Sequence, residues 1–176
     1  KMVFTFAGGS DRQYRFIHNH PAMESKPVDQ TNLPHQIMAN DRVVSVNSAT
    51  QVDLQGQAAS ETAGRRHISG TGGQLQFVRG AYASRGGKSF ICLSSTRVGR
   101  DGTVESRIVA DLTPGNIVTT PRTDIMYVAT EYGVVNLKGR TVPERARALI
   151  SIAHPDFREE LSRKAREYAL LPRSFA

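Results

Sequence analysis

The chain has a single cysteine, Cys92, no tryptophan, and no apolar run near the roughly 18–20 residues that a membrane-spanning helix needs. One cysteine excludes an internal disulfide framework and offers no cysteine cluster for a metal. The apolar stretch within residues 1–6 is too short, and is interrupted too soon, to be a signal peptide. These absences predict a cytoplasmic location, with no membrane segment and no metal site.

Acidic residues are also scarce. There are 16 Asp and Glu against 23 Lys and Arg, which gives a formal net charge of +7 and suggests an anionic partner. The basic residues are scattered, however, and no basic run is interleaved with aromatic residues as in nucleic-acid modules. Dispersed charge is more typical of a solvated surface or of a site for an anionic small molecule. Nucleic-acid binding stays an alternative, and it predicts an affinity that falls steeply with salt.

The length of 176 residues suits one domain with its own core, and 39% apolar residues is ordinary for a globular protein. Strands mixed with helices predict an α/β fold, an open sheet with flanking helices. Strands are expected at residues 2–6, where the pattern is that of a buried strand, and at 43–48, 89–94, 104–110, 117–120 and 125–130. Residues 50–54 are expected to extend the second of these strands or to begin its partner. Residues 24–34 should form a loop.

Helices are expected at residues 11–19, 33–39 and 74–84, and in the last third of the chain. There Thr141 and Glu144 have the spacing of a capping box, so a helix should follow and run to Ile152. A final helix should place Phe157, Leu161, Ala165 and Tyr168 or Ala169 on one face.

The most informative stretch is Ser69-Gly70-Thr71-Gly72-Gly73-Gln74. Its three glycines let the backbone turn sharply and expose N–H groups. The helix expected after it would add unpaired amides that attract an anion. The stretch is not a Rossmann fingerprint, because position 75 is Leu, and it is not a P-loop, because no Gly-Lys-Ser/Thr follows. It predicts either a backbone pocket for an oxyanion or phosphate, or simply a tight turn.

Several phrases spread from about residue 2 to residue 165 resemble one family in their order. They are Phe16–Asn19 before a proline, Pro27–Asn32, Ser45–Ala49, Val52–Gln57, Ser69–Gly80, Ser106–Val109, Tyr127–Leu137 and Ile152–Arg158. Together they are similar to the C-terminal domain of the acetyl-CoA hydrolase/transferase family, nearest to the 4-hydroxybutyrate and butyrate:acetate CoA-transferases. The resemblance implies a CoA-transferase fold, with residues 1–176 forming the C-terminal domain only.

The resemblance also implies a chemistry. A glutamate carboxylate attacks an acyl-CoA thioester, which gives a mixed anhydride and free CoA thiolate. The thiolate returns to the glutamyl carbon, forms a glutamyl-CoA thioester and releases the carboxylate, and the acceptor acid then reverses these steps. CoA is a substrate here and no cofactor is held permanently. The nucleophilic glutamate and the N-terminal half would lie upstream of residue 1, so this fragment alone should be inactive. The full-length enzyme would be a homodimer.

Three residues match catalytic positions of the family. Gly73 matches the amide of the oxyanion hole, and Asn32 matches an asparagine beside the nucleophile that could orient its carboxylate. Glu131 matches a glutamate that lines the active site without being the nucleophile, and in a complete chain it would be the substitute candidate. The structural alternatives are an Asx turn for Asn32 and an ordinary carboxylate at a strand end for Glu131.

Further positions match the CoA side of the site. Ser69, Gly70, Gly72 and Gly73 form the glycine loop, in which Gly72 also suits a purely structural role. Asn47 and Thr50 match a segment beside CoA, although relatives often have an apolar residue where Thr50 stands. Arg97 is a candidate for the CoA phosphates, or else a residue of a solvated loop.

Two other functions remain open from the sequence. An acetyl-CoA hydrolase would use water in place of the acceptor acid, and comparing CoA release with and without acetate distinguishes it. A non-catalytic anion- or nucleotide-binding module built on residues 70–73 would bind CoA or phosphate tightly as the isolated chain. The transferase hypothesis instead predicts weak binding until the upstream half is restored.

Overall fold

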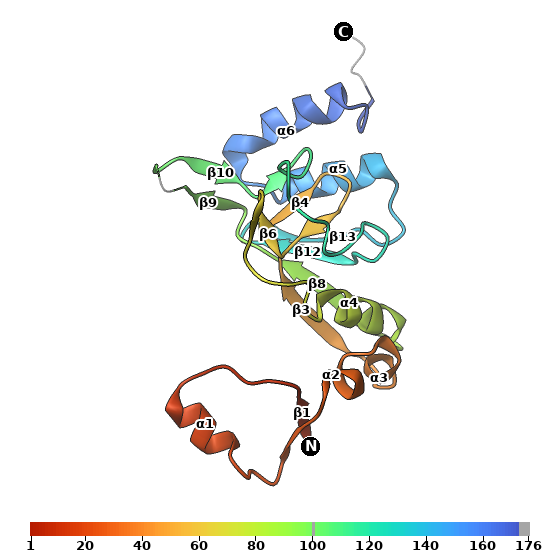
Figure 1. Cartoon of the computed structure of the whole chain (residues 1–176). Helices are drawn as coiled ribbons and strands as arrows, with labels where there is room; N and C mark the ends of the chain where they lie inside the picture. The colour runs from red at the N-terminus through yellow and green to blue at the C-terminus, as the bar shows by residue number, and fades with distance from the viewer. Residues whose placement is uncertain (100, 173–176) are drawn as a thin grey trace.

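The computed structural model describes residues 1–99 and 101–172 (Figure 1). Its centre is a four-stranded sheet with the order β13-β12-β8-β3. The strands are β3 (Val44–Ser48), β8 (Lys88–Cys92), β12 (Tyr127–Thr130) and β13 (Gly133–Asn136). The first three are parallel, and β13 returns antiparallel along the edge of β12. The expected α/β architecture is confirmed.

A smaller sheet has the order β11-β4-β5, formed by β4 (Gln51–Asp53), β5 (Ala58–Ala59) and β11 (Ile108–Val109). Two hairpins flank it: β6 (Thr62–Ala63) with β7 (Arg66–His67), and β9 (Thr96–Val98) with β10 (Val104–Ser106). Residues 50–54 therefore neither extend nor pair with β3, contrary to expectation. The single strand expected at 104–110 is wrong as well, because β10 pairs with β9 while β11 pairs with β4.

The helices α4 (Gln74–Ala83), α5 (Val142–Ser151) and α6 (Pro155–Glu167) agree with the sequence pattern. The capping box of α5 is confirmed, since the Thr141 N–H donates to Glu144 Oε2 at 2.7 Å. Leu161 and Ala165 are buried on α6, as expected, whereas Tyr168 is half exposed. The helices and both sheets share one apolar core, whose fully buried members include Val52, Leu54, Val78, Ile91, Ile108, Val128 and Leu149.

Residues 1–31 form an N-terminal arm that extends away from the sheets (Figure 1). It contains β1 (Met2–Phe4), α1 (Asp11–Ile17), β2 (Met23–Ser25) and α2 (Val28–Thr31), and α3 (Pro34–Met38) follows. Residues 24–34 are thus not simply a loop. No residue of α1 or α2 is buried, and Phe6 is 82% exposed. The expectation of a buried strand at residues 2–6 is wrong, because β1 pairs only with β2 and its residues are exposed or only partly buried.

The strand expected at residues 117–120 is also absent, apart from an isolated bridge between Thr120 and Ala58. Side chains and single carbonyls satisfy the backbone of this segment. The N–H of Ile117 donates to Thr62 Oγ1 at 2.9 Å, and the N–H groups of Thr119 and Thr120 both reach the Ala58 carbonyl. Among the described residues, no helix has the length and apolarity that crossing a membrane requires.

Candidate functional site

A cavity of about 640 Å³ lies where the N-terminal arm, including its helix α2, meets α3, β3 and the beginning of α4. Three of the predicted site residues, Asn32, Asn47 and Gly73, line this cavity together. They come from three separate elements: the end of α2, the strand β3 and the N-cap of α4. We call this space the amide cavity.

Gly73 and Asn32 are in direct contact. A Cβ atom at position 73 would lie 2.5 Å from Asn32 Nδ2, so this approach requires glycine. Asn32 is 9% exposed, and its Oδ1 accepts from Thr31 Oγ1 at 2.9 Å. Its Nδ2 has no hydrogen-bond partner among the described residues, and it lies beside the positive end of the α4 dipole. The cavity therefore holds donors that can bind a carboxylate or an oxyanion.

Neighbouring side chains fix these donors in place. Buried Gln74 donates from Nε2 to Thr120 Oγ1 at 3.0 Å, which anchors the first turn of α4. Asn47 Nδ2 donates to Ser45 Oγ at 2.8 Å, on the face of β3 that carries the buried Ser45. Phe4, Phe6 and Phe77 supply apolar wall. The amide cavity thus combines oriented polar groups with an apolar lining, as small-ligand sites commonly do.

The glycine loop leads into this cavity along the surface. Gly72 has φ of +59°, a left-handed conformation that favours glycine, and no atom lies within 4 Å of its missing Cβ. The left-handed turn at Gly72 is therefore sufficient to explain why glycine stands at this position. Ser69 and Gly70 are exposed, and Ser69 Oγ donates to the Gly70 carbonyl at 3.0 Å. This segment offers accessible polar groups but no closed site of its own.

Thr50 and Arg97 line a second cavity of about 220 Å³. The Thr50 hydroxyl lies 2.9 Å from the Ala59 carbonyl and 2.8 Å from the Thr62 carbonyl, so the polar side chain stabilises the neighbouring strands. Arg97 forms an exposed ion pair with Glu105 at 2.6 Å. Asn47, which lines the amide cavity, lies in β3 three residues before Thr50, which lines this second cavity.

Arg107 also lines the second cavity, and the sequence reasoning did not single it out. Its guanidinium donates to the Thr50 carbonyl at 2.9 Å, to Ser94 Oγ at 3.1 Å and to the Ala49 carbonyl. Burial, and next the charge of Arg97, lower the pKa of Arg107. No carboxylate of a described residue lies within ion-pair distance of it. We call this space the arginine cavity, and its positive charge suits an anion.

Glu131 lies at the carboxyl end of β12, outside both cavities. Ser95 donates to it twice, from its backbone N–H at 2.9 Å and from its hydroxyl at 2.5 Å. Partial burial raises the pKa of the Glu131 carboxyl, but these hydrogen bonds outweigh that effect and hold the pKa below its ordinary value. Glu131 is therefore an ionised group at the strand ends, where α/β proteins commonly bind ligands.

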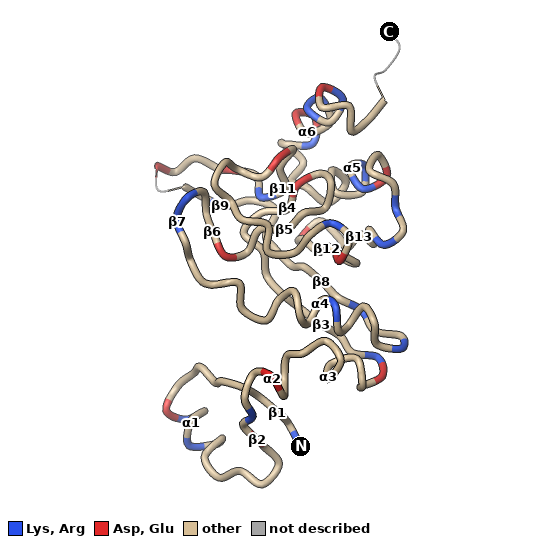
Figure 2. The backbone as a smooth tube through the Cα atoms, turned by 45° about the vertical axis from the view of Figure 1, so that its right-hand side comes forward, with Lys and Arg blue, Asp and Glu red and all other residues tan. Residues whose placement is uncertain are grey.

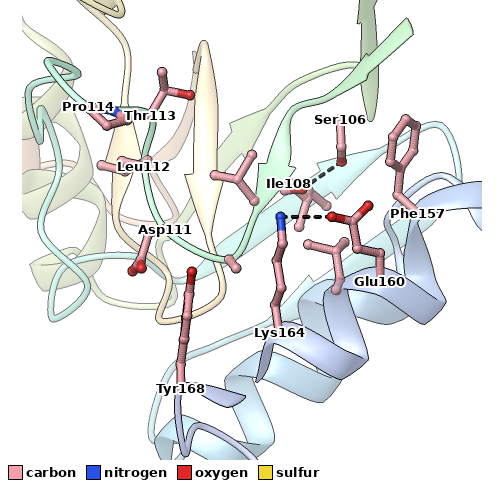
Figure 3. A pocket seen from close by; sticks show the side chains of 13 residues that line it. Ser106, Ile108, Asp111, Leu112, Thr113, Pro114, Phe157, Glu160, Lys164 and Tyr168 are labelled. Atoms are coloured by element: carbon pink, nitrogen blue, oxygen red, sulfur yellow. Dashed lines mark hydrogen bonds and ion pairs between the residues drawn. The ribbon is translucent and has the colours of Figure 1, made fainter. Parts of the chain in front are cut away.

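A third cavity, of about 520 Å³, lies between α6 and residues 108–114 (Figure 3). Its charged groups include Glu160 and Lys164, which form an ion pair at 2.8 Å. None of the predicted site residues lines it.

Lys and Arg are spread along the whole backbone rather than gathered on one face (Figure 2). The fold and the first two cavities define an α/β domain with amide donors beside β3 and arginine donors beside β4.

Comparison with known proteins identifies the family. The acetyl-CoA hydrolase/transferase C-terminal domain matches residues 9–165, and the chain belongs to this family. The probable butyrate:acetyl-CoA coenzyme A-transferase of Syntrophomonas wolfei is 52% identical over 95% of the chain. The 4-hydroxybutyrate coenzyme A transferase of Clostridium kluyveri is 53% identical over 92% of it. The chain spans 37% of the length of each relative.

Solved structures confirm the fold expected from the resemblance. RipA from Yersinia pestis superposes with a TM-score of 0.84 at 48% identity, over 96% of this chain and 36% of that protein. The 4-hydroxybutyrate CoA-transferase of Porphyromonas gingivalis superposes with a TM-score of 0.76 at 43% identity, over 96% of this chain and 38% of its own.

Proposed function

We propose that this chain is the C-terminal domain of a CoA-transferase that moves CoA between an acyl-CoA and a small carboxylate, of the 4-hydroxybutyrate or acetate type. The observation that carries the proposal is the contact between Asn32 and Gly73 in the amide cavity. The family membership and the names of the relatives support the reaction class. The nucleophilic glutamate would come from the part of the longer enzyme that this chain does not span.

In this reaction the amide cavity stabilises negative charge. Asn32 Nδ2 would donate to the attacking glutamate carboxylate and orient it toward the thioester carbonyl. The backbone N–H of Gly73 would donate to the oxyanion that forms on the carbonyl carbon. One such preorganised donor contributes about 10²–10³ in kcat. Because Gln74 anchors the first turn of α4, the Gly73 donor needs little reorganisation during the reaction.

CoA would lie along the loop from Ser69 to Gly72 and the end of β3. Its phosphates are anions, and the arginine cavity, with Arg97 and Arg107, supplies positive charge close to Thr50. The thiol end would then reach past Asn47 into the amide cavity. This placement uses every residue of the predicted CoA side and adds Arg107.

Glu131 would act as an ionised group of the active-site wall rather than as the nucleophile. Both of its oxygens accept hydrogen bonds from Ser95, which holds the carboxylate at the strand ends. To act as a nucleophile in that arrangement, Glu131 would first have to free one oxygen from Ser95. We therefore assign Glu131 a positioning role at the edge that carries Ser95.

The test is transfer by a chimera in which the part of the S. wolfei transferase that precedes its matched region is fused to Lys1. We expect transfer of CoA from butyryl-CoA to acetate by the chimera and none by the chain alone. CoA release that does not depend on acetate would indicate a hydrolase instead. Turnover by the chain alone would contradict the proposal. We further propose a cytoplasmic homodimer for the longer enzyme, which its sedimentation would test.

A further inference from the structure

Glu61 is a buried carboxylate that the proposed reaction does not use. The residue is 6% exposed, and its Oε2 is buried without a hydrogen-bond partner among the described residues. None of the ion pairs of those residues includes it. Removing a charged group from water without a partner is destabilising, so buried carboxylates are normally paired. The free oxygen of Glu61 therefore lacks a donor that the fold without CoA does not supply.

Glu61 lies at the base of the glycine loop, residues 69–73. It directly precedes β6, and its backbone carbonyl accepts hydrogen bonds from the N–H groups of Ile68 at 2.8 Å and Ser69 at 3.3 Å. The loop is therefore fixed to Glu61 where it begins. Beyond that point, none of the N–H groups of residues 70–72 donates to a described residue. A segment with so few hydrogen bonds can move at little cost in free energy.

Ser69 carries a hydroxyl directly at this contact. The hydroxyl donates to the carbonyl of its neighbour Gly70 at 3.0 Å, in an exposed position. Because that bond is local and open to water, exchanging it for another acceptor changes the free energy little. A bond from the hydroxyl to a buried carboxylate would be charge-assisted and therefore stronger. Ser69 thus offers a donor in a weak bond, and Glu61 offers a buried acceptor without one.

We propose that Glu61 is a positioning residue for the glycine loop. When CoA lies along the loop, the loop moves toward β6, and the Ser69 hydroxyl turns from the Gly70 carbonyl to the Glu61 carboxylate. With its proton directed to Glu61, the Ser69 oxygen presents its lone pairs to an N–H donor, a group that the pantetheine arm of CoA contains. The inference rests on the proposed function, because CoA is the ligand that the loop would bind.

The first experiment measures the melting temperature of the chain without CoA. Glu61→Gln keeps the size of the side chain and removes its buried charge, so this variant should melt a few degrees above the wild-type chain. Glu159→Gln is the control, because Glu159 is an exposed residue of α6, and it should melt with the wild type. A Glu61→Gln variant that melts at or below the wild-type temperature would mean that the carboxylate is already paired, which overturns the proposal.

The second experiment is a double-variant cycle in the chimera described above, with butyryl-CoA as the probe. Glu61→Gln and Ser69→Ala should each raise KM about 10-fold, the usual effect of losing a hydrogen bond to a charged group, and leave kcat less affected. The double variant should be no worse than either single variant, because both substitutions remove the same bond. Glu61→Asp keeps the charge and should recover part of the loss. Losses in KM that multiply in the double variant would overturn the proposal.

Calorimetric titration with CoA separates this inference from the proposed function. A chimera that binds CoA without transferring it contradicts the proposed function, and coupling of the two substitutions in the dissociation constant would still support the role of Glu61. A chimera that transfers CoA but shows no coupling overturns the role of Glu61 and leaves the function intact. A chimera that neither binds nor transfers CoA contradicts both.

Discussion

The two ends of the chain are stabilised in different ways. At the C-terminal end, α5 and α6 bury Leu149, Leu161 and Ala165 against the two sheets. At the N-terminal end, α1 and α2 bury no residue, and the arm exposes Phe6 and Phe16. One end is a packed layer, and the other is a surface of apolar side chains without a core.

This difference indicates where the domain needs a partner. Apolar surface of this kind on an isolated domain commonly marks an interaction site. The amide cavity lies between the arm and the elements α3, β3 and α4, so the arm forms its outer wall. We propose that the domain presents half of a site beside the central sheet.

The largest expected effect tests the packing difference. Leu149→Ala empties a fully buried position and should lower the free energy of unfolding of the chain by about 2–5 kcal/mol. Phe6→Ala removes a side chain that is 82% exposed and should change it by less than about 0.5 kcal/mol. Denaturant unfolding of both variants checks this. Similar losses would mean that the arm has a core of its own.

The next prediction concerns a variant that should lower catalytic activity and leave the stability of the fold almost unchanged. Gly73→Ala in the active chimera keeps the backbone N–H of residue 73 but places a Cβ against Asn32 Nδ2. Because the Asn32 amide is displaced, kcat should fall about 10²–10³-fold, with little change in melting temperature. Gly8→Ala is the control, because no atom lies within 4 Å of its Cβ and its φ is not left-handed. Steady-state kinetics of both variants measures this. Equal activities would contradict the proposed role of the Asn32 amide beside Gly73.

A smaller effect is expected at the arginine cavity. Lysine cannot reproduce the three hydrogen bonds of Arg107, so Arg107→Lys should raise KM for acyl-CoA roughly 10-fold and leave kcat less affected. Arg163→Lys is the matched control on the exposed surface of α6, where Arg163 pairs with Glu167. A loss in kcat alone would assign Arg107 to the chemistry instead of CoA binding.

The smallest effect depends on pH. Because hydrogen bonds from Ser95 lower the pKa of Glu131, its ionised form stabilises the fold. That stabilisation is present above the ordinary glutamate pKa of about 4.3 and is lost as pH falls through the lowered folded-state pKa. The wild-type chain should melt a few degrees above Glu131→Gln at pH 7, and the gap should close at low pH. A gap independent of pH would contradict this assignment.

Local patterns predicted the packed end well. The capping box at Thr141 and the apolar face of α6 depend on neighbours three or four residues away, which the sequence displays directly. The strand expected at residues 117–120 was wrong for the opposite reason. Its backbone is satisfied by Thr62 and Ala58, and no local pattern reveals partners more than fifty residues away.

The candidate site likewise has a part that the sequence predicted and a part that it did not. Family resemblance named Asn32 and Gly73, and the structure places them in contact, but composition and spacing alone could not have paired them. Arg107 stood in one of the matching phrases without any local signal of its role. Its hydrogen bonds to residues 49, 50 and 94 arise only when β4, β8 and β11 come together. The roles of the predicted site residues stay predictions.

The most direct test of the account is to locate the CoA thioester that forms on the chimera. After incubation with butyryl-CoA, borohydride reduction and peptide mass analysis would identify the modified glutamate. The account predicts one modified glutamate, in the part that precedes this chain, and a loss of the adduct in the Gly73→Ala variant. A thioester on Glu131, or on any other carboxylate of residues 1–176, would contradict the central claim that this domain supplies the oxyanion donors and receives its nucleophile from elsewhere.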